Sequence, residues 1–364
     1  MKKRLVANLL IIVLFLSYMT VGVAAEFCEL LLPAEIHGVV GTEINLFYDN
    51  VILCNNIAKY QICVESEKGV AGETAWSYTP QKAETFPVKV RILKNGNELL
   101  MEGATQIIVR DTMGNGTEKK VLCIGDSWTE NVFYVSQLRN HFLKPQEGNS
   151  IKLLGTMTNW GTEEIRYEGR GGWSTETYCT RQTYGGKENL FYNPNTQAFD
   201  FGYYLKQNGI ETPDVVIIFL GINDVAHGTA TAKTIQNINE MIASIHGVKA
   251  DIDIGIVLTP PPGASQDGFG RNNACGTTRF TQKMGAFRLA QAMVATYDDG
   301  RLAHVAVIPV NSAVDCVNQY AYEEVKANAY SDVIVRRMTD NVHPVAGGYQ
   351  QCADSIYGYI KSLF

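Results

Sequence analysis

Residues 120–130 read KVLCIGDSWTE, and the rest of the chain is best interpreted outward from this stretch. Residues 121–124 are apolar without a helical period, which is typical of a buried strand in a parallel sheet. The strand ends at a Gly-Asp-Ser turn, and residues 131–143 have a helical pattern. Because ligands bind at the carboxyl ends of strands in open α/β sheets, Ser127 lies where a nucleophile is expected.

The chain beyond this stretch alternates apolar runs with helical segments. Further buried strands are predicted at residues 215–220, 254–258 and 305–310. Helical spacing is found at residues 234–246, 280–297 and within 341–363. Strands and helices that alternate in this way predict a doubly wound parallel sheet over residues 120–364.

Residues 26–110 have a different pattern of apolar and polar residues. Short stretches with partial apolar/polar alternation, separated by turn residues, lie at 43–48, 60–64, 75–78, 87–92 and 105–109. This spacing predicts a small, immunoglobulin-like β-sandwich domain, and the polar residues 111–119 predict a linker after it. We interpret the sandwich as a structural domain in preference to a dedicated sugar-binding module.

The first 25 residues have the three parts of a secretory signal peptide. Basic residues at positions 2–4 precede an apolar stretch, and Val-Ala-Ala at 23–25 forms a small-residue cleavage site. We therefore predict export, to the periplasm, the cell surface or the medium, without stable membrane insertion after cleavage. The alternative is an uncleaved membrane anchor, because the apolar stretch is about long enough to span a bilayer.

The composition excludes some classes of function. The net charge is −6 and no block of Lys or Arg is present, so the sequence does not indicate a nucleic-acid partner. Eight cysteines in an exported chain permit disulfides, although Cys123, inside the predicted central strand, is expected to be a buried thiol. No cysteine pair has the spacing of zinc ligands, and we predict neither a metal nor a cofactor.

A serine nucleophile needs a base, and His343 is the candidate among six histidines. Asp340 precedes it by three residues in TDNVHP. A carboxylate and an imidazole at this spacing on a turn can share a hydrogen bond that fixes the ring. Taken alone, the spacing also fits a helix-capping aspartate beside a surface histidine.

An oxyanion needs hydrogen-bond donors, and two places can supply them. Residues 169–174, GRGGWS, form a glycine-rich loop whose N–H groups can approach a ligand closely. Asn223 follows the predicted strand at 215–220 and offers a side-chain amide. The alternative is that both are ordinary turns or helix caps.

Taken together, these blocks resemble a known family. GDS at 125–127, Gly172 within GRGGWS, GIND at 221–224 and DNVHP at 340–344 are similar, in this order, to the four sequence blocks of the SGNH hydrolases, also called GDSL esterases and lipases. The resemblance covers about residues 120–364. It implies a three-layer, flavodoxin-like α/β fold, preceded here by the β-sandwich.

The resemblance also implies roles for single residues. It makes Ser127 the nucleophile, His343 the base and Asp340 the carboxylate that orients the base. The oxyanion hole would consist of the amides of Ser127 and Gly172 and the side chain of Asn223. An acyl-enzyme would form and then be hydrolysed by water.

The substrate is less well determined by the sequence. Trp128 replaces the leucine usual in the family motif, and Trp173 follows the oxyanion glycine; both rings could stack on a sugar, or could simply pack the sheet edge. Arg170 and His227 complete the candidate substrate-binding residues. We predict a secreted esterase that removes O-acyl groups, in particular O-acetyl groups, from carbohydrate or a small ester. The alternatives are a lipase, phospholipase or thioesterase of the same family, and a non-catalytic glycan-binding protein.

Overall fold

The structure is a computed structural model that describes residues 27–159, 162–272 and 276–364. The predicted signal peptide and Cys275 therefore lie outside the described residues. Within the described ranges, no helix combines the length and the apolar character needed to cross a membrane.

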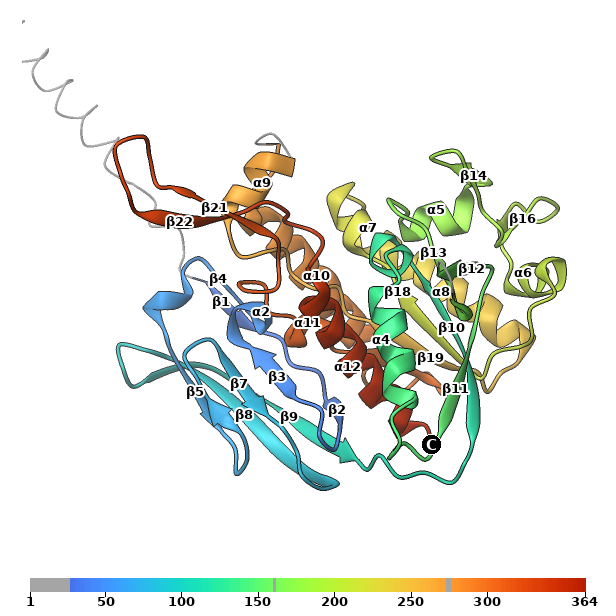
Figure 1. The fold of residues 1–364 in the computed structure, drawn as a ribbon, viewed down its shortest axis with the longest axis horizontal. Coiled ribbons are helices and arrows are strands. Elements are labelled where there is room, and N and C mark those ends of the chain that lie inside the picture. Colours follow the sequence, from blue (N-terminus) through green and yellow to red (C-terminus); the bar gives the residue numbers. More distant parts are fainter. Residues whose placement is uncertain (1–26, 160–161, 273–275) are drawn as a thin grey trace, which may run out of the picture.

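A seven-stranded sheet forms the centre of the larger part of the chain (Figure 1). Its strands are β10 (Glu118–Gly125), β11 (Ser150–Leu154), β12 (Met157–Asn159), β13 (Thr162–Gly169), β18 (Val215–Phe219), β19 (Asp253–Val257) and β20 (Val305–Ile308). Parallel pairing gives the order β11-β10-β18-β19-β20, which is 2-1-3-4-5 in chain order and defines a flavodoxin-like sheet. β13 pairs with the carboxyl-terminal end of β10, beside β11.

Helices cover both faces of this sheet, which makes three layers (Figure 1). Leu122 and Ile124 of β10 enter the core on one face, and Val121 and Cys123 enter the core on the other, because strand side chains alternate. The first core includes side chains of α5 (Thr175–Thr180), α6 (Phe201–Asn208), α8 (Thr231–Val248) and α10 (Arg279–Tyr297). The second includes those of α4 (Phe133–Phe142), α11 (Val310–Ala313) and α12 (Ala346–Ser362). The predicted fold class is confirmed, and Cys123 is fully buried as expected.

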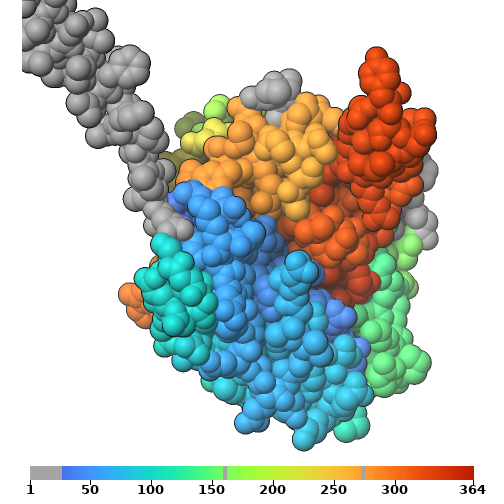
Figure 2. All heavy atoms as spheres, turned by 90° about the vertical axis from the view of Figure 1, so that its left-hand side faces the viewer, coloured from blue at the N-terminus to red at the C-terminus, as the bar shows by residue number. Residues whose placement is uncertain are grey.

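Three hairpins and several short helices were not predicted. The hairpin β14 (Thr183–Tyr184) and β15 (Lys187–Glu188) and the hairpin β16 (Tyr192–Asn193) and β17 (Ala198–Phe199) lie between α5 and α6. The hairpin β21 (Tyr322–Lys326) and β22 (Ile334–Met338) projects from the molecule just before Asp340 (Figures 1 and 2). The short helices are α3 (Ser127–Glu130), α7 (Ile222–Ala226) and α9 (Gln266–Asn272).

The N-terminal region is rich in β-strands, as the alternation predicted. A four-stranded sheet, β2-β9-β8-β5, and a three-stranded sheet, β3-β7-β6, contribute to one hydrophobic core that contains Trp76 and Phe86. The strands are β1 (Cys28–Leu30), β2 (Glu35–Val39), β3 (Ile44–Phe47), β4 (Ile52–Cys54), β5 (Gln61–Glu65), β6 (Val70–Ala71), β7 (Ala75–Tyr78), β8 (Glu84–Lys94) and β9 (Glu98–Arg110). A four-residue helix, α2 (Tyr48–Val51), interrupts the strands, where the sequence predicted no helix.

The N-terminal region packs directly on the α/β part. Figure 2 shows its surface against the segment that contains α9 and α10. A second contact involves α11. Asn50 is buried there, and its Nδ2 donates to the carbonyl oxygens of Asn311 at 2.9 Å and Val314 at 2.7 Å. On α12, Gly358 lies so close to His37 that a Cβ atom there would be 2.2 Å from the His37 carbonyl oxygen. The two parts therefore share a close-packed interface.

Candidate active site

Ser127 is the first residue of α3, directly after the central strand β10. Asp126 caps this short helix, because its Oδ1 accepts a hydrogen bond from the Trp128 N–H at 3.0 Å. Gly125 lets the backbone pass close to Thr129 and Phe219, because it has no side chain. A Cβ atom there would lie 2.0 Å from Thr129 Oγ1 and 2.8 Å from the Phe219 carbonyl oxygen. The turn places the Ser127 side chain, which is half-buried, at the carboxyl edge of the sheet.

The structure brings His343 to Ser127 although 216 residues separate them. His343 Nε2 lies 2.8 Å from Ser127 Oγ, which is hydrogen-bond distance. On the other side of the ring, Nδ1 lies 3.5 Å from Asp340 Oδ2. A hydroxyl, an imidazole and a carboxylate are thus in line, which is the arrangement that acyl transfer by a serine requires.

Asp340 is held by its own turn as well as by the ring. Its Oδ1 accepts hydrogen bonds from the Val342 N–H at 2.7 Å and the His343 N–H at 3.0 Å. Burial acts to raise the pKa of Asp340, but these hydrogen bonds and that of the His343 ring outweigh it and lower the pKa to about 2. Asp340 is therefore an anion at every pH at which the protein would be assayed.

Possible oxyanion donors converge on the same edge. Gly172 has a φ of +79°, a conformation that glycine adopts without strain, and it lies in the loop between β13 and α5. Among the described residues, no hydrogen-bond partner is found for the N–H groups of Gly172 and Ser127. Asn223, on α7, donates one Nδ2 hydrogen to the Trp173 carbonyl oxygen at 2.9 Å, which orients its amide. An amide carries two such hydrogens, so the second remains for a ligand.

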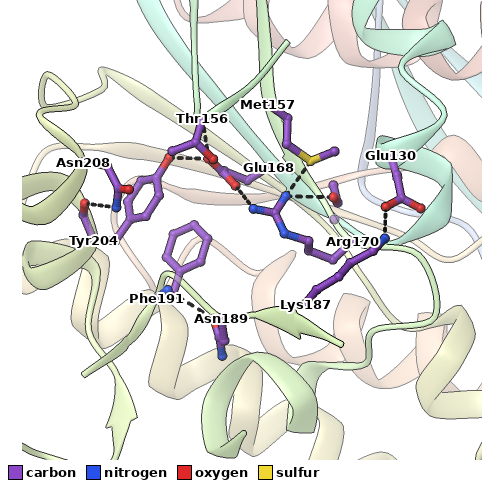
Figure 3. Close-up of polar contacts among 12 residues, drawn as sticks. Glu130, Thr156, Met157, Glu168, Arg170, Lys187, Asn189, Phe191, Tyr204 and Asn208 are labelled. Atoms are coloured by element: carbon purple, nitrogen blue, oxygen red, sulfur yellow. Dashed lines mark hydrogen bonds and ion pairs between the residues drawn. The ribbon is translucent and has the colours of Figure 1, made fainter. Parts of the chain in front are cut away.

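Arg170 is engaged in a buried network at the start of the glycine-rich loop, residues 169–174 (Figure 3). Its Nη2 donates at 2.8 Å to Glu168 Oε2, and the Glu168 side chain is fully buried. Tyr204 OH donates to the other carboxylate oxygen, Oε1, at 2.8 Å. The Arg170 side chain is 11% exposed, so the structure assigns it mainly to this network, and the sequence prediction of substrate contact is not supported by its position.

The sequence left open whether the two tryptophans stack on a sugar or pack the sheet edge, and the structure gives neither ring an open face. Trp128 and Trp173 are each 1% exposed. Trp128 packs against Phe219 and Tyr349, with ring centroids 5.5 and 5.6 Å apart, because the first turn of α3 directs it into the core. Trp173 packs on Tyr178 at 5.0 Å. Both rings follow the alternative interpretation, packing at the sheet edge.

His227 lies apart from this core, exposed at the C-terminal end of α7. It is four residues beyond Asn223, so the two residues share a side of the short helix. The structure thus brings Ser127, His343 and Asp340 into contact, and it leaves His227 exposed at the end of α7.

Three residues near Ser127 were missed by the sequence analysis. Glu130, at the end of α3, forms an ion pair with Lys187 of the β14–β15 hairpin (Figure 3). A Cβ atom on Gly171 would lie 2.4 Å from Glu130 Oε2 and 3.8 Å from the Cβ of Ser127, so this ion pair flanks the nucleophile. On the same hairpin, Tyr184 is 39% exposed and packs edge-on against Trp173 at 6.5 Å.

A signal for this hairpin was present in the sequence. Gly185 and Gly186 both have positive φ, 57° and 75°, between two-residue strands. A Gly-Gly dipeptide is a standard two-residue hairpin turn. The strands are too short for alternation to show, which is why the hairpin was missed.

Asp126 is the second carboxyl group of the site and is 1% exposed. Its Oδ2 is buried and has no hydrogen-bond partner among the described residues. Burial raises the pKa of Asp126 to about 7, although the hydrogen bond from the Trp128 N–H and the nearby His343 act in the opposite direction. The carboxyl groups of Asp126 and Asp340 therefore differ widely in pKa.

Comparison with known proteins adds a family. Residues 123–351, more than half of the chain, match the model of the GDSL-like lipase/acylhydrolase family. No curated protein sequence matches. Similar solved structures include a family 3 carbohydrate esterase of Clostridium thermocellum, with 17% identity over 68% of this chain and 96% of that chain and a TM-score of 0.41. A family 3 carbohydrate esterase from Talaromyces cellulolyticus has 17% identity over 67% and 97% with a TM-score of 0.44. A possible lipase from Chitinophaga pinensis has 13% identity over 67% and 98% with a TM-score of 0.37.

Proposed function

From the premise that this chain belongs to the GDSL-like lipase/acylhydrolase family, and is therefore an ester hydrolase, we propose that it is a serine esterase that removes O-acetyl groups from carbohydrate. The observation that carries the catalytic part is the 2.8 Å contact between Ser127 Oγ and His343 Nε2, with Asp340 behind the ring. Export through the predicted signal peptide belongs to the same proposal.

The proposed reaction uses Ser127, His343 and Asp340 in both of its halves. His343 takes the Ser127 proton while Oγ attacks the ester carbonyl carbon, and Asp340 stabilises the imidazolium that forms. The imidazolium then gives its proton to the leaving alkoxide, which leaves an acyl-enzyme. A water molecule, deprotonated by His343, attacks this intermediate; the imidazolium then returns the proton to Ser127 Oγ as the acyl–oxygen bond breaks, which releases the carboxylic acid and regenerates Ser127.

The negative charge of each tetrahedral intermediate needs donors that are already in place. The N–H groups of Ser127 and Gly172 and the remaining Nδ2 hydrogen of Asn223 are in our proposal the oxyanion hole. Asn223 is suited to this role because the Trp173 carbonyl oxygen already fixes its amide plane. No reorganisation of these dipoles is then needed as charge develops.

The surroundings of Ser127 favour a polar alcohol as the leaving group. The groups beside it are glycine amides, the Asn223 amide and the Glu130–Lys187 ion pair, which can hydrogen-bond to sugar hydroxyls. Tyr184, on the same hairpin as Lys187, presents an exposed aromatic ring of the kind that packs on the apolar face of a sugar. A long acyl chain would be better served by an apolar wall, so we favour acetyl.

The test compares p-nitrophenyl acetate, butyrate and octanoate, with Ser127→Ala as the control, and then acetylated oligosaccharides. We expect Ser127-dependent turnover that falls steeply beyond acetate, and release of acetate from the oligosaccharides. Turnover that rises with chain length would contradict the deacetylase and favour a lipase or thioesterase of the same family. Turnover that persists in Ser127→Ala would remove Ser127 from the role of nucleophile.

A further inference from the structure

We propose that Asp49, in the N-terminal region, is a positioning residue for the catalytic loop, which we define as residues 339–344. The proposal rests on the proposed function, because it gives Asp49 a part in the reaction of Asp340 and His343. It also gives the N-terminal region a function: to brace the loop of the α/β part on which those two residues are carried. Figure 2 shows the two parts in contact on this side of the molecule.

Asp49 lies on α2 and holds two cations of α10. Its Oδ1 accepts from Lys283 Nζ at 2.7 Å, and its Oδ2 accepts from Arg279 Nη2. The Lys283 side chain is only 5% exposed, and Asp49 is its ion-pair partner within the described residues. A buried cation that loses its partner is strongly unfavourable. Burial acts to raise the pKa of Asp49, but Lys283 and Arg279 hold it below its usual value, so the carboxylate stays charged.

Arg279 extends this contact to the catalytic loop. Its Nε donates to the Gly263 carbonyl oxygen at 3.2 Å, while the Gly263 N–H donates to the Asn341 carbonyl oxygen at 3.1 Å. Asn341 is fully buried in the middle of the loop. Two hydrogen bonds and one ion pair therefore connect a carboxylate of the N-terminal region with the backbone that carries the catalytic pair.

A second route runs along α10 itself. Gln282 is the neighbour of Lys283 on this helix, and its Oε1 accepts from Asn341 Nδ2 at 3.4 Å. Asp49 thus fixes α10 at the point where the helix touches the catalytic loop. The loop follows the projecting β21–β22 hairpin and lies outside any named strand or helix, so side-chain and cross-segment contacts of this kind determine its place.

The position of the loop matters because the Ser127–His343 contact crosses from one segment to another. A misplacement of about 1 Å, caused from a distance, can lower a rate about a hundredfold. We therefore expect Asp49→Asn to lower kcat about ten- to a hundredfold while KM changes little, since substrate contacts are left in place. Rates are to be expressed per active site, titrated with a serine-directed phosphonate, so that unfolded protein does not enter the comparison.

Glu29→Gln is the matched control. Glu29, on β1, pairs with Arg288 on the same helix α10, nine residues beyond Arg279, and neither partner contacts the catalytic loop among the described residues. This variant also removes one ion pair between the N-terminal region and α10. We expect its kcat per active site to equal that of the wild type. An equal loss in both variants would show a general effect of the interface and overturn the positioning role.

Hydrogen exchange tests the same inference without a substrate. The N–H groups of Val342 and His343 are bonded to Asp340 Oδ1 and should be protected in the wild type. We expect these amides to exchange about tenfold faster in Asp49→Asn and at the wild-type rate in Glu29→Gln. Unchanged exchange in Asp49→Asn would overturn the proposal. Hydrogen exchange needs no turnover, so this result can be interpreted even if the protein is not an esterase. The esterase assignment is tested separately, by the Ser127→Ala control.

A double-variant comparison gives a further check. If Asp49 acts in part through Arg279, the loss of kcat in Asp49→Asn combined with Arg279→Gln is smaller than the product of the two single losses, because both changes break the connection through Gly263 while the route along α10 depends on Asp49 alone. Two independent effects would multiply instead, and this outcome would contradict the route through Gly263.

Discussion

At the scale of the residue, the two oxygens of Asp340 have different tasks. Oδ1 is saturated by two backbone N–H groups of its own turn, and Oδ2 faces the His343 ring. The sequence predicted the three-residue spacing of Asp340 and His343, but not that each oxygen has its own partner. Because the turn holds Oδ1, the carboxylate is oriented independently of its contact with the His343 ring.

A substitution at Asp340 separates these tasks. Asp340→Asn keeps a carbonyl oxygen for the turn but places a donor opposite His343 Nδ1, which favours the wrong tautomer. We expect kcat on p-nitrophenyl acetate to fall by about 10³- to 10⁴-fold while the thermal midpoint changes little. Asp340→Ala should lower both quantities, since the turn then loses its acceptor. A kcat for Asp340→Asn within a few fold of the wild type would exclude Asp340 from orienting the base.

Asn223 is predicted to act on the transition state and not on the bound substrate. Asn223→Ala should lose kcat by about a hundredfold or more, with little change in KM, because an oxyanion exists only after attack. Steady-state kinetics on the acetate ester decide this. A change confined to KM would instead make Asn223 a residue that binds substrate.

The buried Asp126 predicts a pH-dependent cost in stability. Its pKa is raised from the ordinary value of 3.8 to about 7, so the unfolded chain loses this proton at a lower pH than the folded protein does. Stability should therefore fall as pH rises from about 4 to about 7, by at most about 4 kcal/mol from this group. Asp126→Asn cannot ionise and lacks this fall. Urea unfolding at pH 4.5 and 8 measures this. The free energy of unfolding of the variant, relative to that of the wild type, should be higher at pH 8 than at pH 4.5; a constant difference would contradict the prediction.

At the scale of the element, our proposal of a carbohydrate substrate depends most on the β14–β15 hairpin. It carries Tyr184 and Lys187 to the oxyanion side of Ser127. Tyr184→Ala should raise KM for an acetylated oligosaccharide about fivefold, since an aromatic contact contributes about 1 kcal/mol, and should leave the KM for p-nitrophenyl acetate unaffected. Tyr330→Ala is the control, because Tyr330 is fully exposed on the β21–β22 hairpin. Equal KM values for both variants would remove Tyr184 from sugar binding.

The elements also show what the sequence could predict. The apolar run at 215–220 coincides with β18, and the helical segment at 280–297 coincides with α10, because a buried strand and a long helix leave strong periodic patterns. The order of the blocks was enough to name Ser127 and His343. The ring directions of Trp128 and Trp173 were not predictable, because a pattern of residue types does not state which side of a turn faces the core. The strands β14 and β15 have only two residues each, which is too short to show an apolar/polar alternation.

At the scale of the whole molecule, the N-terminal region and the α/β part are joined through buried polar groups. No local pattern links Asn50 with Asn311 or Asp49 with Lys283, which are more than 200 residues apart, so the sequence could suggest a domain but not its contacts. The predicted linker and domain boundaries stay predictions. The interface itself yields a test of stability.

Asn50→Ala should destabilise the protein by about 1 to 3 kcal/mol, because the carbonyl oxygens of Asn311 and Val314 would lose a buried donor. Urea unfolding measures this directly. Asn97→Ala, at an exposed position in the turn between β8 and β9, serves as the control and should change stability by less than about 0.5 kcal/mol. Equal effects would show that the Asn50 contacts contribute nothing.

The hydrogen bond between Ser127 and His343 spans 216 residues of the chain. During synthesis, the serine leaves the ribosome long before the histidine, because β18, β19 and β20 all lie between the two in the chain. In the proposed mechanism, the polypeptide holds a serine without a base until the last segment docks. Esterase activity would then be the final property that this protein acquires, and we expect a chain that ends before His343 to be inert.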